Sequence, residues 1–151
     1  MIRQRLNESL KEAMRAKDTV GVSTVRLILA ALKDRDIAAR SKGNTDGITD
    51  DEVLGLLQTM VKQRRESIDL YEKGGRLDLA EQERAEIGVL QRFLPAQMDE
   101  QAIRSAVDTV IREQSATSLK DMGRIMSTLR DKYAGRMDFG RASGFVKSAL
   151  S

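Results

Sequence analysis

The chain has 151 residues, of which 40% are hydrophobic, 32% are charged and 3% are aromatic, and its formal net charge is +3. This composition is typical of a soluble globular protein, and the single proline and few aromatic residues favour helices over an all-β fold. The sequence contains neither cysteine nor histidine, which excludes disulfides, Cys/His zinc sites, thiol nucleophiles and Ser-His-Asp catalysis.

Four helices are predicted before the only proline, Pro95, because apolar residues recur there at intervals of three and four. The third has the clearest start, since Thr49 and Glu52 have the T-x-x-E spacing of a capping box, and Gly74-Gly75 ends it. The expected ranges are about 2–17, 18–40, 49–73 and 77–93.

Arg64, Glu83 and Glu86 are charged residues on otherwise apolar stripes of the third and fourth helices. One interpretation is a catalytic or ligand-binding cluster. The other is a structural ion pair where the two stripes meet, which the lack of histidine and of metal-ligand spacing favours. No metal site and no cofactor are predicted.

Three more helices are predicted beyond Pro95, which interrupts helical geometry and marks a boundary. The sequence therefore predicts an all-α protein with a four-helix unit over residues 1–94 and a three-helix unit over residues 95–151. The expected helix starts in the second unit are Asp99, Ser118 with Asp121, and Asp138, and the expected stop between the last two helices is Gly135.

The segment from Asp121 to Leu150 is basic. Between Lys120 and Lys147 the chain has seven Lys or Arg residues and three Asp, a net charge of +4, which favours binding of a polyanion. Gly123 lies inside a predicted helix, where glycine costs about 1 kcal/mol relative to alanine. Either close helix packing or backbone approach to a phosphate or a partner explains it.

No membrane segment is expected, because the longest apolar run, Leu27 to Leu32, is too short to cross a bilayer. Residues 1–17 alternate charged and apolar positions, unlike a secretory signal. The lack of cysteine fits a reducing compartment, and the expected location is the cytoplasm.

Three stretches resemble the YqeY family: KQRRESIDLYEKGGRLDLAEQERAEIGVLQRFLP (62–95), DMGRIMSTLRDKYAGRMD (121–138) and FVKSAL (145–150). That family is related to the helical tail of the GatB subunit of the aspartyl/glutamyl-tRNA amidotransferase, and the resemblance covers essentially the whole chain. It implies a cytoplasmic, all-helical protein whose second unit is a GatB-tail-like domain.

The resemblance also implies contact with tRNA. This expectation applies to Arg124 and Arg136 because they match the family motif, and to three further residues only because they lie near that motif. The implied RNA-binding residues are Arg124, Lys132, Arg136, Arg141 and Lys147. By homology, the resemblance also links the family to carbon–nitrogen ligase activity with glutamine as amido-N-donor. The amidotransferase needs an amidase subunit and a kinase-like core, and no set of residues in this chain could replace them.

The leading hypothesis is a non-catalytic tRNA-binding or tRNA-amidation accessory module that recognises tRNA by shape, because the sequence shows no aromatic platform for stacking bases. The alternative is a protein-interaction module that docks on an aminoacyl-tRNA synthetase or amidotransferase without contacting RNA. A third hypothesis is an enzyme that uses Arg64, Glu83 and Glu86.

Overall fold

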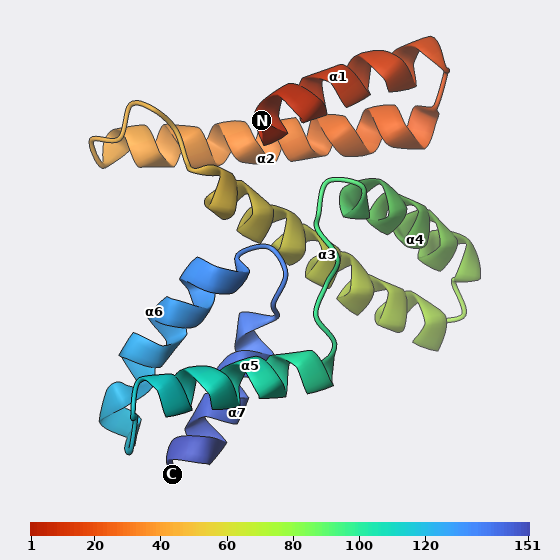
Figure 1. The fold of residues 1–151 in the computed structure, drawn as a ribbon. Coiled ribbons are helices and arrows are strands. Elements are labelled where there is room, and N and C mark those ends of the chain that lie inside the picture. Colours follow the sequence, from red (N-terminus) through yellow and green to blue (C-terminus); the bar gives the residue numbers. More distant parts are fainter. The chain divides into compact units, whose positions relative to one another are not determined.

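The computed structural model describes all 151 residues and is entirely helical, which confirms the predicted all-α class (Figure 1). The chain divides into two compact units, Met1–Pro95 and Ala96–Ser151. The first contains α1 (Ile2–Arg15), α2 (Thr19–Ser41), α3 (Asp50–Lys73) and α4 (Leu77–Gln91). The second contains α5 (Glu100–Glu113), the short 3₁₀ helix η1 (Leu119–Asp121), α6 (Met122–Tyr133) and α7 (Phe139–Leu150).

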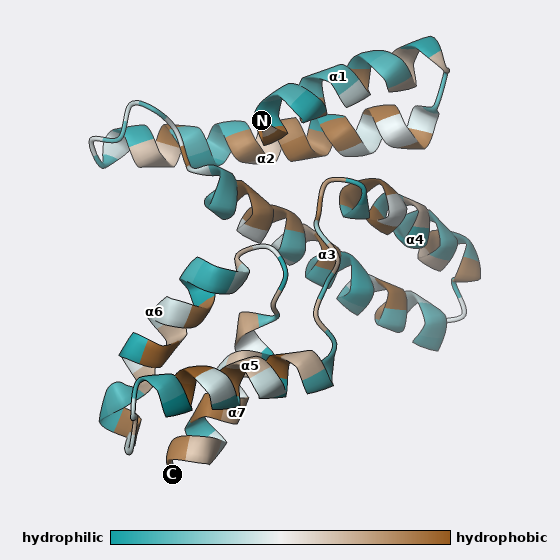
Figure 2. Ribbon diagram, viewed as in Figure 1, coloured by the Kyte–Doolittle hydropathy of each residue, from teal (hydrophilic) through white to brown (hydrophobic).

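The first unit consists of two helical hairpins, α1–α2 and α3–α4, with α4 also packed on α2. Figure 2 shows that α1 is largely hydrophilic, whereas hydrophobic residues are frequent along α2. The two hairpins share one core, whose fully buried side chains are Leu6, Val25, Ile28, Val53, Leu57, Ala80 and Leu90.

Local signals set the helix ends in this unit. The Thr49 hydroxyl accepts a hydrogen bond from the Glu52 backbone N–H and the Glu52 carboxylate accepts one from that of Thr49, so the predicted capping box is confirmed. Helix α1 ends two residues earlier than predicted, because Lys17 adopts a left-handed conformation with φ 55°.

A long-range ion pair that the sequence did not reveal connects distant parts of this unit. Arg3 Nη1 lies 2.6 Å from Asp36 Oδ2, and Arg3 Nη2 donates to the Ile48 carbonyl at 2.9 Å. The Ile48 N–H in turn donates to Asp36. These bonds, above all that from Arg3, hold the pKa of Asp36 below its usual value, and they tie α1, α2 and the loop before α3 together.

The second unit packs its three α-helices around a separate core. Asp99 and Asp138 cap α5 and α7 as predicted. Gly135, two residues after the end of α6, adopts a left-handed conformation with φ 77°. The predicted cap at Ser118 with Asp121 is present as a capping box, but it opens the 3₁₀ helix η1, and α6 begins only at Met122. The fully buried side chains of the core include Ile103, Val107, Val110, Ile125, Leu129, Met137, Ala142 and Val146.

Candidate nucleic-acid interface

The predicted RNA-binding residues all lie on α6, α7 and the turn between them, and all five are exposed. Three of them have carboxylate partners: Arg124 with Asp121 at 3.1 Å, Lys132 with Glu113 at 3.6 Å and Arg141 with Asp138 at 3.8 Å. Arg136 lies over the Tyr133 ring, with 5.9 Å to its centroid, and Lys147 has no ion-pair partner.

These residues do not form a single cluster. Lys132, Arg136 and Arg141 lie around the connection between α6 and α7, whereas Arg124 is eight residues before Lys132, or about 12 Å along the helix. Lys147 is six residues beyond Arg141, which places it about 240° further around α7. The structure therefore gathers three of the five at one end of the α6–α7 hairpin.

Sequence reasoning did not single out two further cations of this segment. Lys120 and Arg130 are exposed and have no carboxylate partner. Three of the seven basic residues between Lys120 and Lys147 are ion-paired, so four are not. The family resemblance did not indicate Lys120 or Arg130 as RNA-binding residues. Only their exposure and their lack of a carboxylate partner, both visible in the structure, make them candidates.

Asp121 has a structural role at the start of this segment. Its carboxylate accepts hydrogen bonds from the backbone N–H groups of Thr117 and Ser118, and these bonds, together with Arg124, hold the pKa of Asp121 below its usual value. The carboxylate is therefore ionised at neutral pH and compensates part of the Arg124 charge.

Gly123 is exposed in the first turn of α6, and a Cβ built on it would meet no atom within 4 Å. The hypothesis of close helix packing at Gly123 is therefore wrong. Because Gly123 is exposed and has no side chain, the backbone at this position is accessible to an approaching molecule.

Substitution Gly123→Ala is expected to raise the free energy of unfolding by about 0.5–1 kcal/mol, because alanine restricts the unfolded chain and fits without a clash. Gly88→Ala in α4, which is also exposed and unobstructed, is the matched control. Urea unfolding measures both. If RNA approaches the backbone at Gly123, only Gly123→Ala also weakens RNA binding; equal binding by both variants would contradict such an approach.

The second predicted cluster lies in the first unit, between α3 and α4. Arg64 Nε lies 3.1 Å from Glu86 Oε2 and 3.9 Å from Glu83 Oε2, and Arg64 Nη1 donates to the Met60 carbonyl. The three side chains are largely buried, with exposed fractions of 13% for Arg64, 14% for Glu86 and 21% for Glu83. The structure thus brings all three predicted residues together, with the guanidinium already engaged by protein acceptors.

Burial and the adjacent Glu86 raise the pKa of Glu83 above its usual value, despite the opposing effect of Arg64. The folded state therefore binds this proton more tightly than the unfolded state. The protonated Glu83 therefore stabilises the folded protein at pH values below the pKa that this carboxyl group has in the unfolded chain. This contribution is lost as the pH rises through the raised pKa of the folded state.

Substitution Glu83→Gln is accordingly expected to stabilise the protein at neutral pH, with the gain disappearing under acidic conditions. Urea unfolding from pH 4 to 8 measures this, with the exposed Glu66→Gln in α3 as the control. A Glu83→Gln variant that is less stable than the natural protein at pH 7 would show that the attraction to Arg64 outweighs burial.

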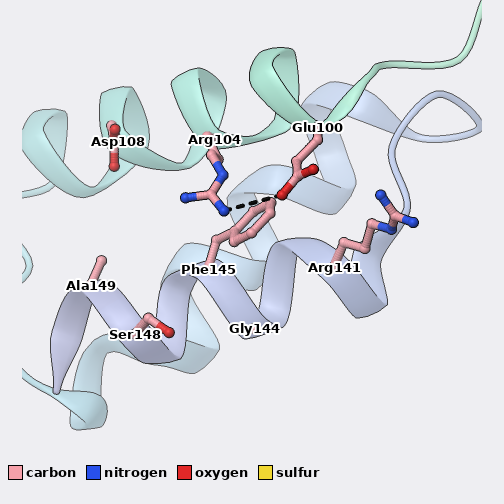
Figure 3. Close-up of a pocket in the computed structure, with 8 residues that line it drawn as sticks. All are labelled: Glu100, Arg104, Asp108, Arg141, Gly144, Phe145, Ser148 and Ala149. Atoms are coloured by element: carbon pink, nitrogen blue, oxygen red, sulfur yellow. Dashed lines mark hydrogen bonds and ion pairs between the residues drawn. The ribbon is translucent and has the colours of Figure 1, made fainter.

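A shallow groove runs along the second unit between α5 and α7 (Figure 3). At its centre the Arg104 guanidinium lies over the Phe145 ring, 4.3 Å from the ring centroid, and Glu100 pairs with Arg104 at 3.1 Å. Sequence reasoning missed this arrangement, because Arg104 and Phe145 are 41 positions apart and neither belongs to a local motif. The remaining lining residues are Asp108, Arg141, Gly144, Ser148 and Ala149.

No group of three or more acidic side chains is placed to hold a metal ion. None of the helices combines the length and the apolar character that crossing a membrane requires.

The fold and these surfaces define an all-helical protein of two units with an exposed basic segment on the second. The chain belongs to the YqeY family: the family model described as "Yqey-like protein" matches residues 3–150.

The chain is similar to curated fungal proteins named "Altered inheritance of mitochondria protein 41, mitochondrial". It is 37% identical over 91 residues to the one from Eremothecium gossypii, covering 60% of this chain and 48% of the relative. The match to Pyrenophora tritici-repentis is 31% identical over 135 residues, covering 85% and 71%. The chain spans about half the length of the first of these relatives.

The names of these relatives contradict the predicted cytoplasmic location, since they describe mitochondrial proteins. The prediction depended on the family resemblance and, from the residues, on the absence of cysteine and of a secretory signal. Neither feature separates the cytoplasm from another reducing compartment.

Proposed function

We propose that this protein is a non-catalytic tRNA-binding module, or an accessory to tRNA amidation, and that its second unit contacts the RNA. The observation that carries the proposal is the set of exposed basic residues on α6, α7 and their connection, three of which lack carboxylate partners. The resemblance to the GatB tail that the sequence motifs imply supports tRNA as the polyanion. The chain contains no histidine or cysteine that would support autonomous catalysis.

The mechanism is neutralisation of backbone phosphates. Lys132, Arg136 and Arg141 would contact one stretch of RNA backbone around the α6–α7 connection, and Arg124 a second stretch about 12 Å away. Three of these four cations would exchange a carboxylate partner for a phosphate, at small cost because ion pairs at a protein surface contribute little to stability.

Fluorescence anisotropy with bulk tRNA across a salt series tests this proposal. Binding should weaken steeply as salt rises, and the log–log slope reports the number of phosphates neutralised. The absence of binding at low salt would overturn it.

The alternative is docking on an aminoacyl-tRNA synthetase or amidotransferase without RNA contact. Leu119 favours it, because 49% of this apolar side chain is exposed at the start of the basic segment. Binding to such a partner that persists at high salt, together with no binding to tRNA, would support this function instead.

A further inference from the structure

The α5–α7 groove of the second unit has a composition unlike that of the basic segment. Glu100, Arg104 and Asp108 follow one another at intervals of four residues, so they lie along one side of α5 and face α7 across the groove. Phe145 of α7 lies opposite Arg104, between the two helices (Figure 3).

The Arg104 guanidinium presents a flat, accessible surface. Its central carbon lies over the Phe145 ring, 4.3 Å from the ring centroid, while Glu100 accepts a hydrogen bond from Nη2 at 3.1 Å and restrains its orientation. The side chain is nevertheless 61% exposed. A guanidinium held on an aromatic ring in this way is a surface on which an unpaired base stacks.

The charges around Arg104 favour a base over a phosphate. Glu100 and Asp108 flank the guanidinium on α5 and would repel a phosphate placed at the centre of the groove. A nucleobase is neutral, and the Asp108 carboxylate, which has no ion-pair partner, can accept a hydrogen bond from a base amino group. Arg141 lies at the other end of the groove from Asp108, where the backbone of the same strand can pass.

We propose that the α5–α7 groove binds an unpaired RNA base stacked on the Arg104–Phe145 pair. This inference rests on the proposed tRNA-binding function and adds a part of the RNA that the basic segment does not read: a single-stranded end or loop. It also revises the expectation of recognition by shape alone. Arg104 and Asp108 of α5 and the distant Phe145 of α7 form a stacking site that no local motif indicates.

The test uses the full chain and a short single-stranded RNA in which one adenine is replaced by 2-aminopurine, whose fluorescence is quenched by stacking. A blunt RNA duplex serves as the ligand without unpaired bases. Arg104→Lys keeps the charge but removes the planar guanidinium, and it is an exposed substitution that leaves the core intact. Arg65→Lys in α3 of the first unit is the matched control, because Arg65 is exposed and unpaired, lies on no aromatic ring and is outside the proposed RNA-binding surface.

Arg104→Lys is expected to bind the single strand about fivefold or more weakly than the natural protein, to lose the quenching, and to keep the same salt slope and the same affinity for the duplex. Arg65→Lys should match the natural protein in every measurement. Salt-dependent binding of tRNA by the natural protein, with no quenching and no effect of Arg104→Lys, would overturn the stacking site and leave the proposed function intact. No binding of the natural protein to any of these RNAs would overturn both.

Discussion

Reversing the charges of Arg124 and Arg136 together, as Arg124→Glu/Arg136→Glu, is expected to weaken tRNA binding about tenfold or more and to lower the log–log salt slope by about 2. Each of these residues would neutralise one phosphate, so the loss of two contacts removes two released counterions. Both side chains are exposed, and neither belongs to the core of the second unit. The helix content should therefore stay unchanged, which circular dichroism measures beside the binding.

A control with the same change in net charge separates a local contact from a general effect. Lys62→Glu/Arg65→Glu alters two exposed, unpaired basic residues of α3 in the first unit. This variant should bind tRNA with nearly the natural affinity. Equal losses in the two double variants would mean that the RNA responds to total charge, and the assignment of the interface to α6 and α7 would be wrong.

Removing Arg64 is expected to cause the largest loss of stability. Arg64→Met keeps the unbranched stem but leaves Glu83 and Glu86 facing each other with little access to solvent. Breaking a buried pair from one side costs about 3–5 kcal/mol, and the residual exposure of these groups places the expected loss at about 3 kcal/mol. The loss should shrink at acidic pH, as the two carboxyl groups become protonated.

Urea unfolding at neutral and acidic pH measures this effect. Arg76→Met is the control, because the Arg76–Asp78 pair is exposed, with 60% and 68% of the two side chains accessible, and such pairs contribute little to stability. If Arg64→Met costs no more than Arg76→Met, Arg64 is not required to stabilise the contact between α3 and α4.

The sequence predicted those parts of the fold that local chemistry determines. The Thr49 capping box and the caps at Asp99 and Asp138 were confirmed because each involves residues within three positions of one another. The helix ends were less predictable, since Lys17 takes a left-handed conformation that the apolar pattern does not reveal.

The parts that could not be predicted depend on residues far apart in the chain. Arg3 and Asp36 are 33 positions apart, and Arg104 and Phe145 lie on different helices, so the apolar periodicity of a single helix contains no information about either pair. The packing hypothesis for Gly123 failed for the same reason, because whether a neighbouring helix approaches a glycine depends on tertiary structure. The basic segment was visible in the sequence, but its separation into a group at the α6–α7 connection and a distant Arg124 was not.

The most direct test of the proposed interface is a titration of the isotope-labelled full chain with tRNA, followed in ¹H–¹⁵N correlation spectra. The proposal predicts amide shifts concentrated between Asp121 and Lys147, strongest around the α6–α7 connection, that disappear as salt is raised. Shifts confined to residues 1–95, or a spectrum unchanged by tRNA at low salt, would contradict it.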